Sequence, residues 1–267
     1  MPYIYNDGVS IHYQTYGKKT QTACIVLLTG AGCDHTLWRS QIDALENDFF
    51  IIAVDNRGGG KSDCPDGPYA ATVMARDVLA VIAAEQRKTV NLVGFSLGGL
   101  IAQKLVSFHP EKIERLALFN CSLGPGNPDT VLPEREVVNM FLYLAALTDE
   151  DRARNSADYN FGKDYRTSNP KEYDAFFDYV IKNSAGIPAQ LPVVASEEAF
   201  IADFDTVNMP VLVVMSTDDP VTPPENGDAF KKHLPHARIE YLDGYHASML
   251  IHPTRVSTLL KEFLSKI

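Results

Sequence analysis

The feature of this chain that most limits its possible folds is Ser96, which has Gly94 and Gly98 two positions away on either side. Residues 90–93 predict a short buried strand, and residues 97–109 predict a helix. A strand that turns directly into a helix strains the residue at the turn and leaves little room for side chains beside it. The pattern therefore predicts a serine hydroxyl at a helix N-terminus, where developing negative charge is stabilised. A purely structural glycine turn is the alternative, and the flanking strand and helix disfavour it.

Apolar runs alternate with amphipathic segments through most of the chain, which predicts a mainly parallel sheet with helices on both faces. Continuous apolar runs are typical of strands buried on both sides. The turn Asn6-Asp7-Gly8 predicts an initial hairpin, whose first strand brings the sheet to eight strands. The other expected strands are residues 9–13, 23–28, 49–54, 90–93, 113–119, 211–215 and 238–242, and the expected helices are residues 37–45, 73–82, 97–109, 226–233 and 253–266.

The alternation of strands and helices stops at residue 122 and resumes at about residue 206. Helices are expected within this interval at residues 134–147, 150–157 and 171–183, and no strand is expected there. The interval holds 15 Asp and Glu against 7 Lys and Arg, together with 11 of the 26 aromatic residues. We therefore predict a core formed by residues 1–121 and 206–267, with residues 122–205 inserted as a helical cap.

Composition excludes several classes of function. The net charge of −10 argues against binding to nucleic acid or to an anionic membrane surface. No apolar run reaches the length of a membrane span, and the N-terminus lacks the basic and apolar regions of a signal peptide. The cysteines have no zinc-site spacing and are typical of reduced thiols in a cytoplasmic protein; they are Cys24, Cys33, Cys64 and Cys121.

A serine hydroxyl is a poor nucleophile at neutral pH, so Ser96 needs a general base, and the base needs an acid to orient it. Among the seven histidines, His246 directly follows the strand expected at residues 238–242. A loop at that end of the sheet would lie over the serine turn, which makes His246 the favoured base. His252 is the alternative.

Three glycine-rich turns, with an aspartate and a histidine late in the chain, resemble the α/β-hydrolase superfamily. The turns are residues 29–32, 55–62 and 94–98, and the late residues are Asp219 and His246. The resemblance covers nearly the whole chain outside the predicted cap. It implies the α/β-hydrolase fold and a catalytic triad in the chain order Ser, Asp, His.

The same resemblance implies where the acid and the oxyanion hole lie. In the superfamily, the acid usually follows a late strand, after a small residue and two variable positions. Residues 216–219 fit this spacing with Asp219 as the acid, and the neighbouring Asp218 is the alternative. Some members of the superfamily carry the acid after the preceding strand, but Asn120 occupies that position here and cannot ionise. The oxyanion donors would be the backbone N–H groups of Leu97 and Ala31.

The glycine-rich turn at residues 55–62 carries three glycines in a row, a pattern that can bind phosphate. No helix is expected after its Gly60-Lys61-Ser62 sequence, so nucleotide binding is not predicted. We expect Arg57 to pair with a carboxylate and to fix this loop beside the site.

Two further segments most resemble the 3-oxoadipate enol-lactonases and related carboxylesterases. These are Leu37-Trp38-x-x-Gln41 and residues 217–224. The enol-lactone substrate of that subfamily is anionic, so the resemblance implies a local positive site, although the cap as a whole is acidic. The candidates in the cap are Arg135, Arg152, Arg154 and Arg166.

The sequence thus predicts a serine hydrolase that needs no cofactor or metal and cleaves a small carboxylic ester or lactone. Ser96 is the predicted nucleophile, His246 the base and Asp219 the acid. The expected partner is a small-molecule substrate. The alternatives are a C–C bond hydrolase or a perhydrolase with the same triad, and a non-enzymatic ligand receptor or signalling protein on the same fold.

Overall fold

One eight-stranded sheet forms the centre of the protein in the computed structural model, which describes residues 2–144, 148–195, 201 and 204–265. The strand order is β1-β2-β4-β3-β5-β6-β7-β8. β1 and β2 form an antiparallel hairpin, β2 is antiparallel to β4, and every other pair is parallel. The predicted mostly parallel sheet is therefore confirmed. Its strands are β1 (Tyr3–Asn6), β2 (Val9–Tyr16), β3 (Cys24–Leu28), β4 (Phe50–Val54), β5 (Val90–Phe95), β6 (Ile113–Phe119), β7 (Val211–Ser216) and β8 (Arg238–Leu242).

The strands β3, β4 and β7 coincide with continuous apolar runs of the sequence, and each residue of these strands and of β5 is buried. Their register aligns the strand ends, because Leu28 at the end of β3 pairs with both Val54 and Gly94. The loops that follow these strands therefore emerge at one edge of the sheet. Side chains far apart in the sequence can meet at that edge.

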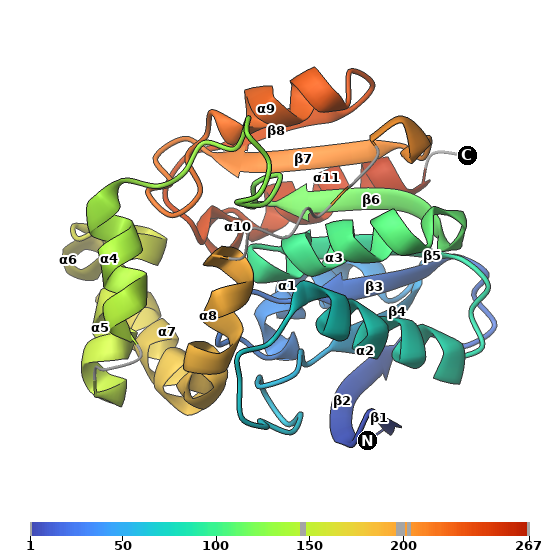
Figure 1. Cartoon of the computed structure of the whole chain (residues 1–267), viewed down its shortest axis with the longest axis horizontal. Coiled ribbons are helices and arrows are strands. Elements are labelled where there is room, and N and C mark those ends of the chain that lie inside the picture. The colour runs from blue at the N-terminus through green and yellow to red at the C-terminus, as the bar shows by residue number, and fades with distance from the viewer. Residues whose placement is uncertain (1, 145–147, 196–200, 202–203, 266–267) are drawn as a thin grey trace.

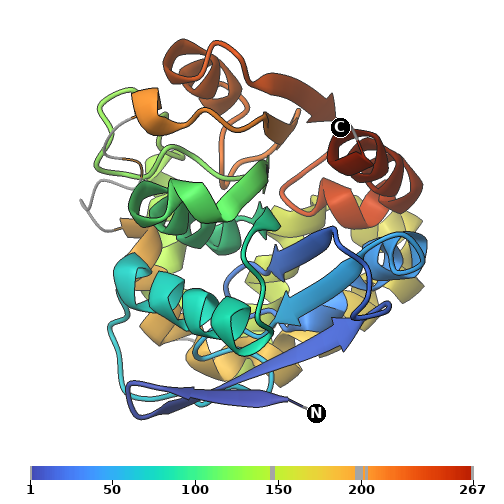
Figure 2. The same ribbon diagram turned by 90° about the vertical axis from the view of Figure 1, so that its right-hand side faces the viewer.

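Helices cover both faces of the sheet, as Figure 2 shows. One face packs against α1 (Arg39–Leu45) and α11 (Pro253–Ser265), where Trp38 is fully buried. The other face packs against α2 (Ala71–Ala84), α3 (Leu97–Phe108) and α9 (Asn226–His233). None of the helices in the described part of the chain combines the length and the apolar character needed to cross a membrane.

In the described part of the chain, five α-helices lie between β6 and β7, at the carboxyl ends of the parallel strands (Figure 1). Three of them match predicted helices, although residues 145–147 of the first prediction lie outside the described residues. The short α6 and α8 were not predicted. In α8, Pro192 lies inside the helix and interrupts the expected pattern. No strand is present in the described part of residues 122–205. The helices are α4 (Arg135–Leu144), α5 (Asp149–Phe161), α6 (Tyr165–Ser168), α7 (Pro170–Asn183) and α8 (Ile187–Ala195).

The turn between β5 and α3 is as crowded as the glycines predict. Ser96 has a φ of +51°, in the left-handed region that strains a residue with a side chain. A Cβ on Gly98 would lie 2.5 Å from the carbonyl oxygen of Leu28, and a Cβ on Gly94 would meet the backbone of Gly98. α3 can therefore approach the end of β3 closely only because both positions lack side chains.

We predict that Gly98→Ala lowers the free energy of unfolding by about 3 kcal/mol or more, because the new methyl group would overlap backbone atoms that cannot move aside. Urea unfolding followed by circular dichroism measures the change. Gly8→Ala is the control, since Gly8 has a φ of +81° but nothing within 4 Å of an added Cβ. It should show only the conformational cost of about 1–2 kcal/mol. A cost at Gly98 no larger than that at Gly8 would contradict the packing argument.

Candidate active site

Ser96, His246 and Asp219 come together in a hydrogen-bonded chain at the carboxyl edge of the sheet. His246 Nε2 lies 3.0 Å from the Oγ of Ser96, and His246 Nδ1 lies 2.7 Å from Oδ2 of Asp219. Each comes from a different strand end, since Ser96 follows β5, Asp219 follows β7 and His246 follows β8. A carboxylate only accepts, so Nδ1 carries the proton and Nε2 is left to accept the serine proton.

The carboxylate of Asp219 is fixed by hydrogen bonds on both oxygens. Its Oδ1 accepts the backbone N–H groups of Val221 and Thr222 at 2.8 and 2.9 Å. Its Oδ2 also accepts Nδ2 of Asn120 at 2.8 Å, alongside the ring of His246. Asp219 is only 3% exposed, so this set of donors replaces the water that would otherwise solvate its charge.

The two alternatives left open by the sequence lie elsewhere. Asp218 is exposed, and its carboxylate accepts a hydrogen bond from the hydroxyl of Thr217. His252 has its Nε2 2.9 Å from the backbone oxygen of Asp243. Neither residue belongs to the hydrogen-bonded chain at Ser96.

Ala31 and Leu97, the predicted oxyanion donors, lie close to Ser96. Leu97 is the first residue of α3, so its N–H has no acceptor within the helix. A Cβ on Gly30 would lie 3.4 Å from the Cβ of Ser96, which places the loop at residues 29–34 directly against the serine. Ala31 and Ser96 line the same cavity.

That cavity has a volume of about 70 Å³ and lies between the core and the helices α5, α7 and α8. Among the described residues that line it, none is Lys, Arg, Asp or Glu, and most are apolar. The core contributes Gly30, Ala31, Cys33, Leu37, Phe95, Ser96, Val221, His246 and Ala247, and α5 to α8 contribute Tyr159, Asn160, Phe176, Val180 and Ile187.

Cys33 is a second potential nucleophile in this cavity, but its thiol is not activated. Burial raises the pKa of Cys33 to about 12, against an ordinary value near 9. The thiol is therefore protonated at neutral pH, and a protonated thiol is a weak nucleophile. Ser96 is the lining residue whose hydroxyl is hydrogen-bonded to a base.

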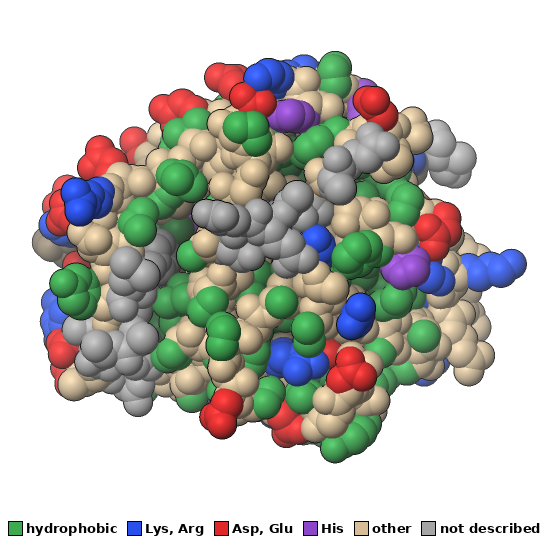
Figure 3. Space-filling model, in the orientation of Figure 1, with side chains coloured by type: hydrophobic (Ala, Val, Ile, Leu, Met, Phe, Trp, Pro, Cys, Tyr) green, Lys and Arg blue, Asp and Glu red, His purple; other side chains and the backbone are tan. Residues whose placement is uncertain are grey.

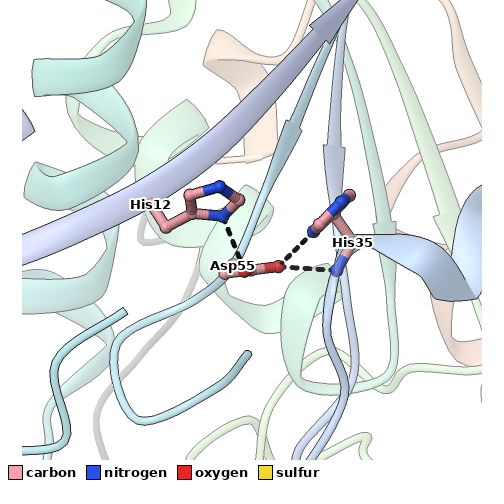
Figure 4. A group of neighbouring side chains, drawn as sticks. All are labelled: His12, His35 and Asp55. Carbon is pink, nitrogen blue, oxygen red and sulfur yellow. Dashed lines mark hydrogen bonds and ion pairs between the residues drawn. The ribbon is translucent and has the colours of Figure 1, made fainter. Parts of the chain in front are cut away.

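A second buried cluster lies beside the loop at residues 29–34, where His12 and His35 flank Asp55 (Figure 4). Oδ1 of Asp55 accepts both the backbone N–H and Nδ1 of His35, at 2.7 and 2.8 Å. Oδ2 accepts Nδ1 of His12 at 2.8 Å and the backbone N–H of Lys61 at 2.9 Å. The three side chains could in principle offer a set of metal ligands. Four N–H donors already occupy the lone pairs of the carboxylate, so the arrangement fits a structural hydrogen-bond network rather than a metal site.

The turn at residues 55–62 is structural in the way the sequence predicts. Arg57 forms two 2.9 Å hydrogen bonds with the carboxylate of Asp77 on α2. Gly60 has a φ of +55°, and a Cβ there would overlap the carboxylate of Asp55. The glycines of this turn thus make room for the buried carboxylate.

Sequence reasoning missed three polar residues around the site, namely Asn120, Tyr179 and Gln190. The sequence indicates only that Asn120 cannot serve as the acid, whereas in the structure its amide donates a hydrogen bond to Asp219. Gln190 is fully buried on the face of α8 that also carries Ile187 and Val193. The spacing of Gln190 between Ile187 and Val193 could have indicated a buried polar residue on a helix, but Pro192 obscured the helix itself.

Comparison with known proteins identifies the family of this chain. Residues 24–253 match the family model for the alpha/beta hydrolase fold. A 3-oxoadipate enol-lactonase from Acinetobacter baylyi is 25% identical over 261 residues, which cover 96% of this chain and 95% of that protein. The crystal structure of the enol-lactonase from Burkholderia xenovorans LB400 is similar, with a TM-score of 0.88, 25% identity and coverage of 99% and 100%. The esterase RhEst1 from Rhodococcus sp. ECU1013 has a TM-score of 0.83, 25% identity and coverage of 99% and 98%.

The fold, the serine turn and these matches define the class of this protein as a hydrolase. The chain belongs to the alpha/beta hydrolase fold family.

The buried His12 should make stability depend on pH. Burial lowers the pKa of His12, despite the opposing effect of Asp55, with smaller contributions from His35 and Lys61. As the pH falls below about 6.5, the unfolded chain takes up a proton on this residue before the folded chain does. The free energy of unfolding should therefore decrease from pH 7.5 to pH 5.5.

His12→Asn should flatten this pH dependence, because it removes the titrating group while keeping an N–H donor near Asp55. Urea unfolding at four pH values between 5.5 and 7.5 measures the slope. His236→Asn is the control, because the ring of His236 lies nearer the surface, beside the backbone of Met209. An identical slope in wild type and His12→Asn would exclude His12 as the source.

Proposed function

We propose that this protein hydrolyses small, neutral carboxylic esters or lactones through an acyl-enzyme on Ser96. The observation that carries the proposal is the hydrogen-bonded chain from Ser96 through His246 to Asp219, at a helix N-terminus and in a cavity. The named activities of the relatives, a lactonase and an esterase, support the same class of substrate.

The proposed reaction uses the three side chains in turn. Ser96 Oγ attacks the substrate carbonyl carbon while His246 Nε2 takes the hydroxyl proton. The N–H groups of Leu97 and Ala31 bind the negative oxygen of the tetrahedral intermediate. His246 then gives its proton to the leaving alkoxide, which departs as an alcohol, or as the free hydroxyl end of an opened lactone. Water, deprotonated by His246, attacks the acyl carbon; the bond to Ser96 Oγ then breaks, His246 returns the proton to Oγ, and the acid is released.

The charge distribution favours a neutral substrate. Charged side chains of both signs lie on the outer surface of the cap end, at left in Figure 3. Arg135, Arg154 and Arg166 are exposed, and Arg154 and Arg166 contact the rings of Phe177 and Tyr173. The side chain of Arg152, the fourth arginine considered, lies outside the described residues. An acyl group with its own carboxylate would have to enter a cavity whose described lining carries no cation.

Ser96→Ala should lower the turnover of p-nitrophenyl acetate by a factor on the order of 10⁴–10⁶, because none of the other described lining residues is an activated nucleophile. The release of p-nitrophenol measures the rate. Ser107→Ala, near the other end of α3, is the matched control and should keep the wild-type rate. An unchanged rate in Ser96→Ala would end the proposal.

The neutral ester p-nitrophenyl butanoate should be cleaved with a kcat/KM at least about 100-fold above that of the mono-p-nitrophenyl ester of succinate. The two acyl groups have similar length, but the second ends in a carboxylate whose burial without a partner costs several kcal/mol. Initial rates on both esters give the ratio. Equal rates, or a preference for the succinate ester, would show that a cation reaches the cavity.

A further inference from the structure

The loop at residues 29–34 carries the proposed oxyanion donor, and the core holds both ends of this loop. At its start, Nδ2 of Asn56 donates to the backbone oxygen of Thr29 at 2.9 Å. Just beyond its end, Asp55 accepts both N–H groups of His35, as Figure 4 shows. These contacts fix where the loop leaves β3 and where it rejoins the core. They do not reach Ala31 and Gly32 in the middle.

The middle of the loop is held by a side chain from the cap. Oε1 of Gln190, on α8, accepts the backbone N–H of Gly32 at 2.8 Å. Nε2 of the same amide donates to the backbone oxygen of Arg57 at 2.8 Å. Gln190 is fully buried, so water cannot replace either bond. Because one end of the amide meets a donor and the other an acceptor, only one orientation of the side chain satisfies both.

Together, the two hydrogen bonds of Gln190 form a clamp between the loop and the turn at residues 55–62. Further contacts on the same side support this clamp. The hydroxyl of Tyr179, on α7, accepts the backbone N–H of Asp34 at 2.7 Å and lies 3.1 Å from the backbone oxygen of Asp34. The backbone oxygen of Ala189 accepts the N–H of Tyr69 at 2.9 Å. A Cβ on Gly186 would overlap the backbone of Gly58, so the segment before α8 lies directly on the turn at residues 55–62.

We propose that Gln190 is a positioning residue that completes the oxyanion hole from the cap. The N–H of Gly32 belongs to the peptide that follows Ala31. Holding that peptide limits rotation about Ala31, and so limits the orientation of the preceding peptide, whose N–H on Ala31 faces the substrate. This inference rests on the proposed function of Ser96. If α8 moved away from the core, the triad would stay in place but the oxyanion hole would lose the support of Gln190. The docked position of α8 is therefore part of the catalytic geometry.

The test uses Gln190→Met, which keeps the side-chain volume but removes both hydrogen bonds. We expect kcat for p-nitrophenyl butanoate to fall about 10- to 100-fold, somewhat less than the loss on removing an oxyanion donor. KM should change less than about 3-fold, because the cavity walls are unaltered. Gln190→Glu keeps an acceptor for Gly32, and because burial favours the protonated acid, its hydroxyl can donate to the backbone oxygen of Arg57. This variant should recover part of the lost kcat.

A boronic acid distinguishes positioning from a general loss of structure. Butylboronic acid adds to Ser96 Oγ, the hydroxyl proton passes to His246, and a boronate oxygen occupies the oxyanion hole. Its Kd should rise in Gln190→Met by about the same factor as kcat falls. Gln103→Met removes another fully buried amide, which donates to the backbone oxygen of Ser122 at 2.8 Å. It should lower the melting temperature without raising the boronate Kd.

The possible outcomes separate this proposal from the one on which it rests. If wild type binds the boronate but Gln190→Met has unchanged kcat and Kd, the clamp is wrong while the triad stands. If wild type neither cleaves the ester nor binds the boronate, the proposed function itself fails. Should Gln190→Met not fold, Tyr179→Phe removes the hydroxyl from Asp34 and should lower kcat about 3- to 10-fold. No loss there would equally overturn the clamp.

Discussion

The close approach of α3 to the end of β3 determines the geometry of the whole site. Gly98 lies against the carbonyl of Leu28, so the helix N-terminus, the strained Ser96 and the loop after β3 are all brought to one point. Parallel register then delivers the other two members of the hydrogen-bonded chain from the ends of β7 and β8. A side chain at Gly98 would separate these parts, because strands of a packed sheet cannot shift independently.

Two buried carboxylates organise the site, and each is solvated by protein donors instead of water. Asp219 accepts hydrogen bonds from Asn120, His246 and two backbone N–H groups. Asp55 accepts hydrogen bonds from His12, His35 and Lys61. Burial alone would raise the pKa of Asp55, but the donors outweigh it and lower that pKa. One carboxylate fixes the ring of His246, and the other anchors the loop that faces Ser96.

The serine turn and most of the strands were predictable because the sequence patterns that indicate them are local. The turn at Ser96 can close only if its neighbours at positions 94 and 98 lack side chains, and β3 and β4 are unbroken apolar runs. Asp219, and not Asp218, is the aspartate hydrogen-bonded to His246, while its role as the acid stays a prediction. The division into residues 1–121 with 206–267 and residues 122–205 stays a prediction.

The contacts that sequence reasoning missed are those made across long sequence separations. Gln190 meets Gly32 across 158 positions, and no local pattern encodes that pairing. Asn120 lies in a left-handed conformation with a φ of +45°, which asparagine tolerates better than most residues, but its partner follows a different strand. Such pairings depend on which loops lie side by side. The register of the strands determines this, so it cannot be inferred from a local pattern.

Covalent labelling with a fluorophosphonate, followed by peptide mapping, tests the central claim most directly. The account predicts stoichiometric labelling at Ser96, a labelling rate lowered by orders of magnitude in His246→Gln and Asp219→Asn, and an unchanged rate in Asp218→Asn. Labelling at another residue, or at Ser96 with no dependence on His246 and Asp219, would contradict it.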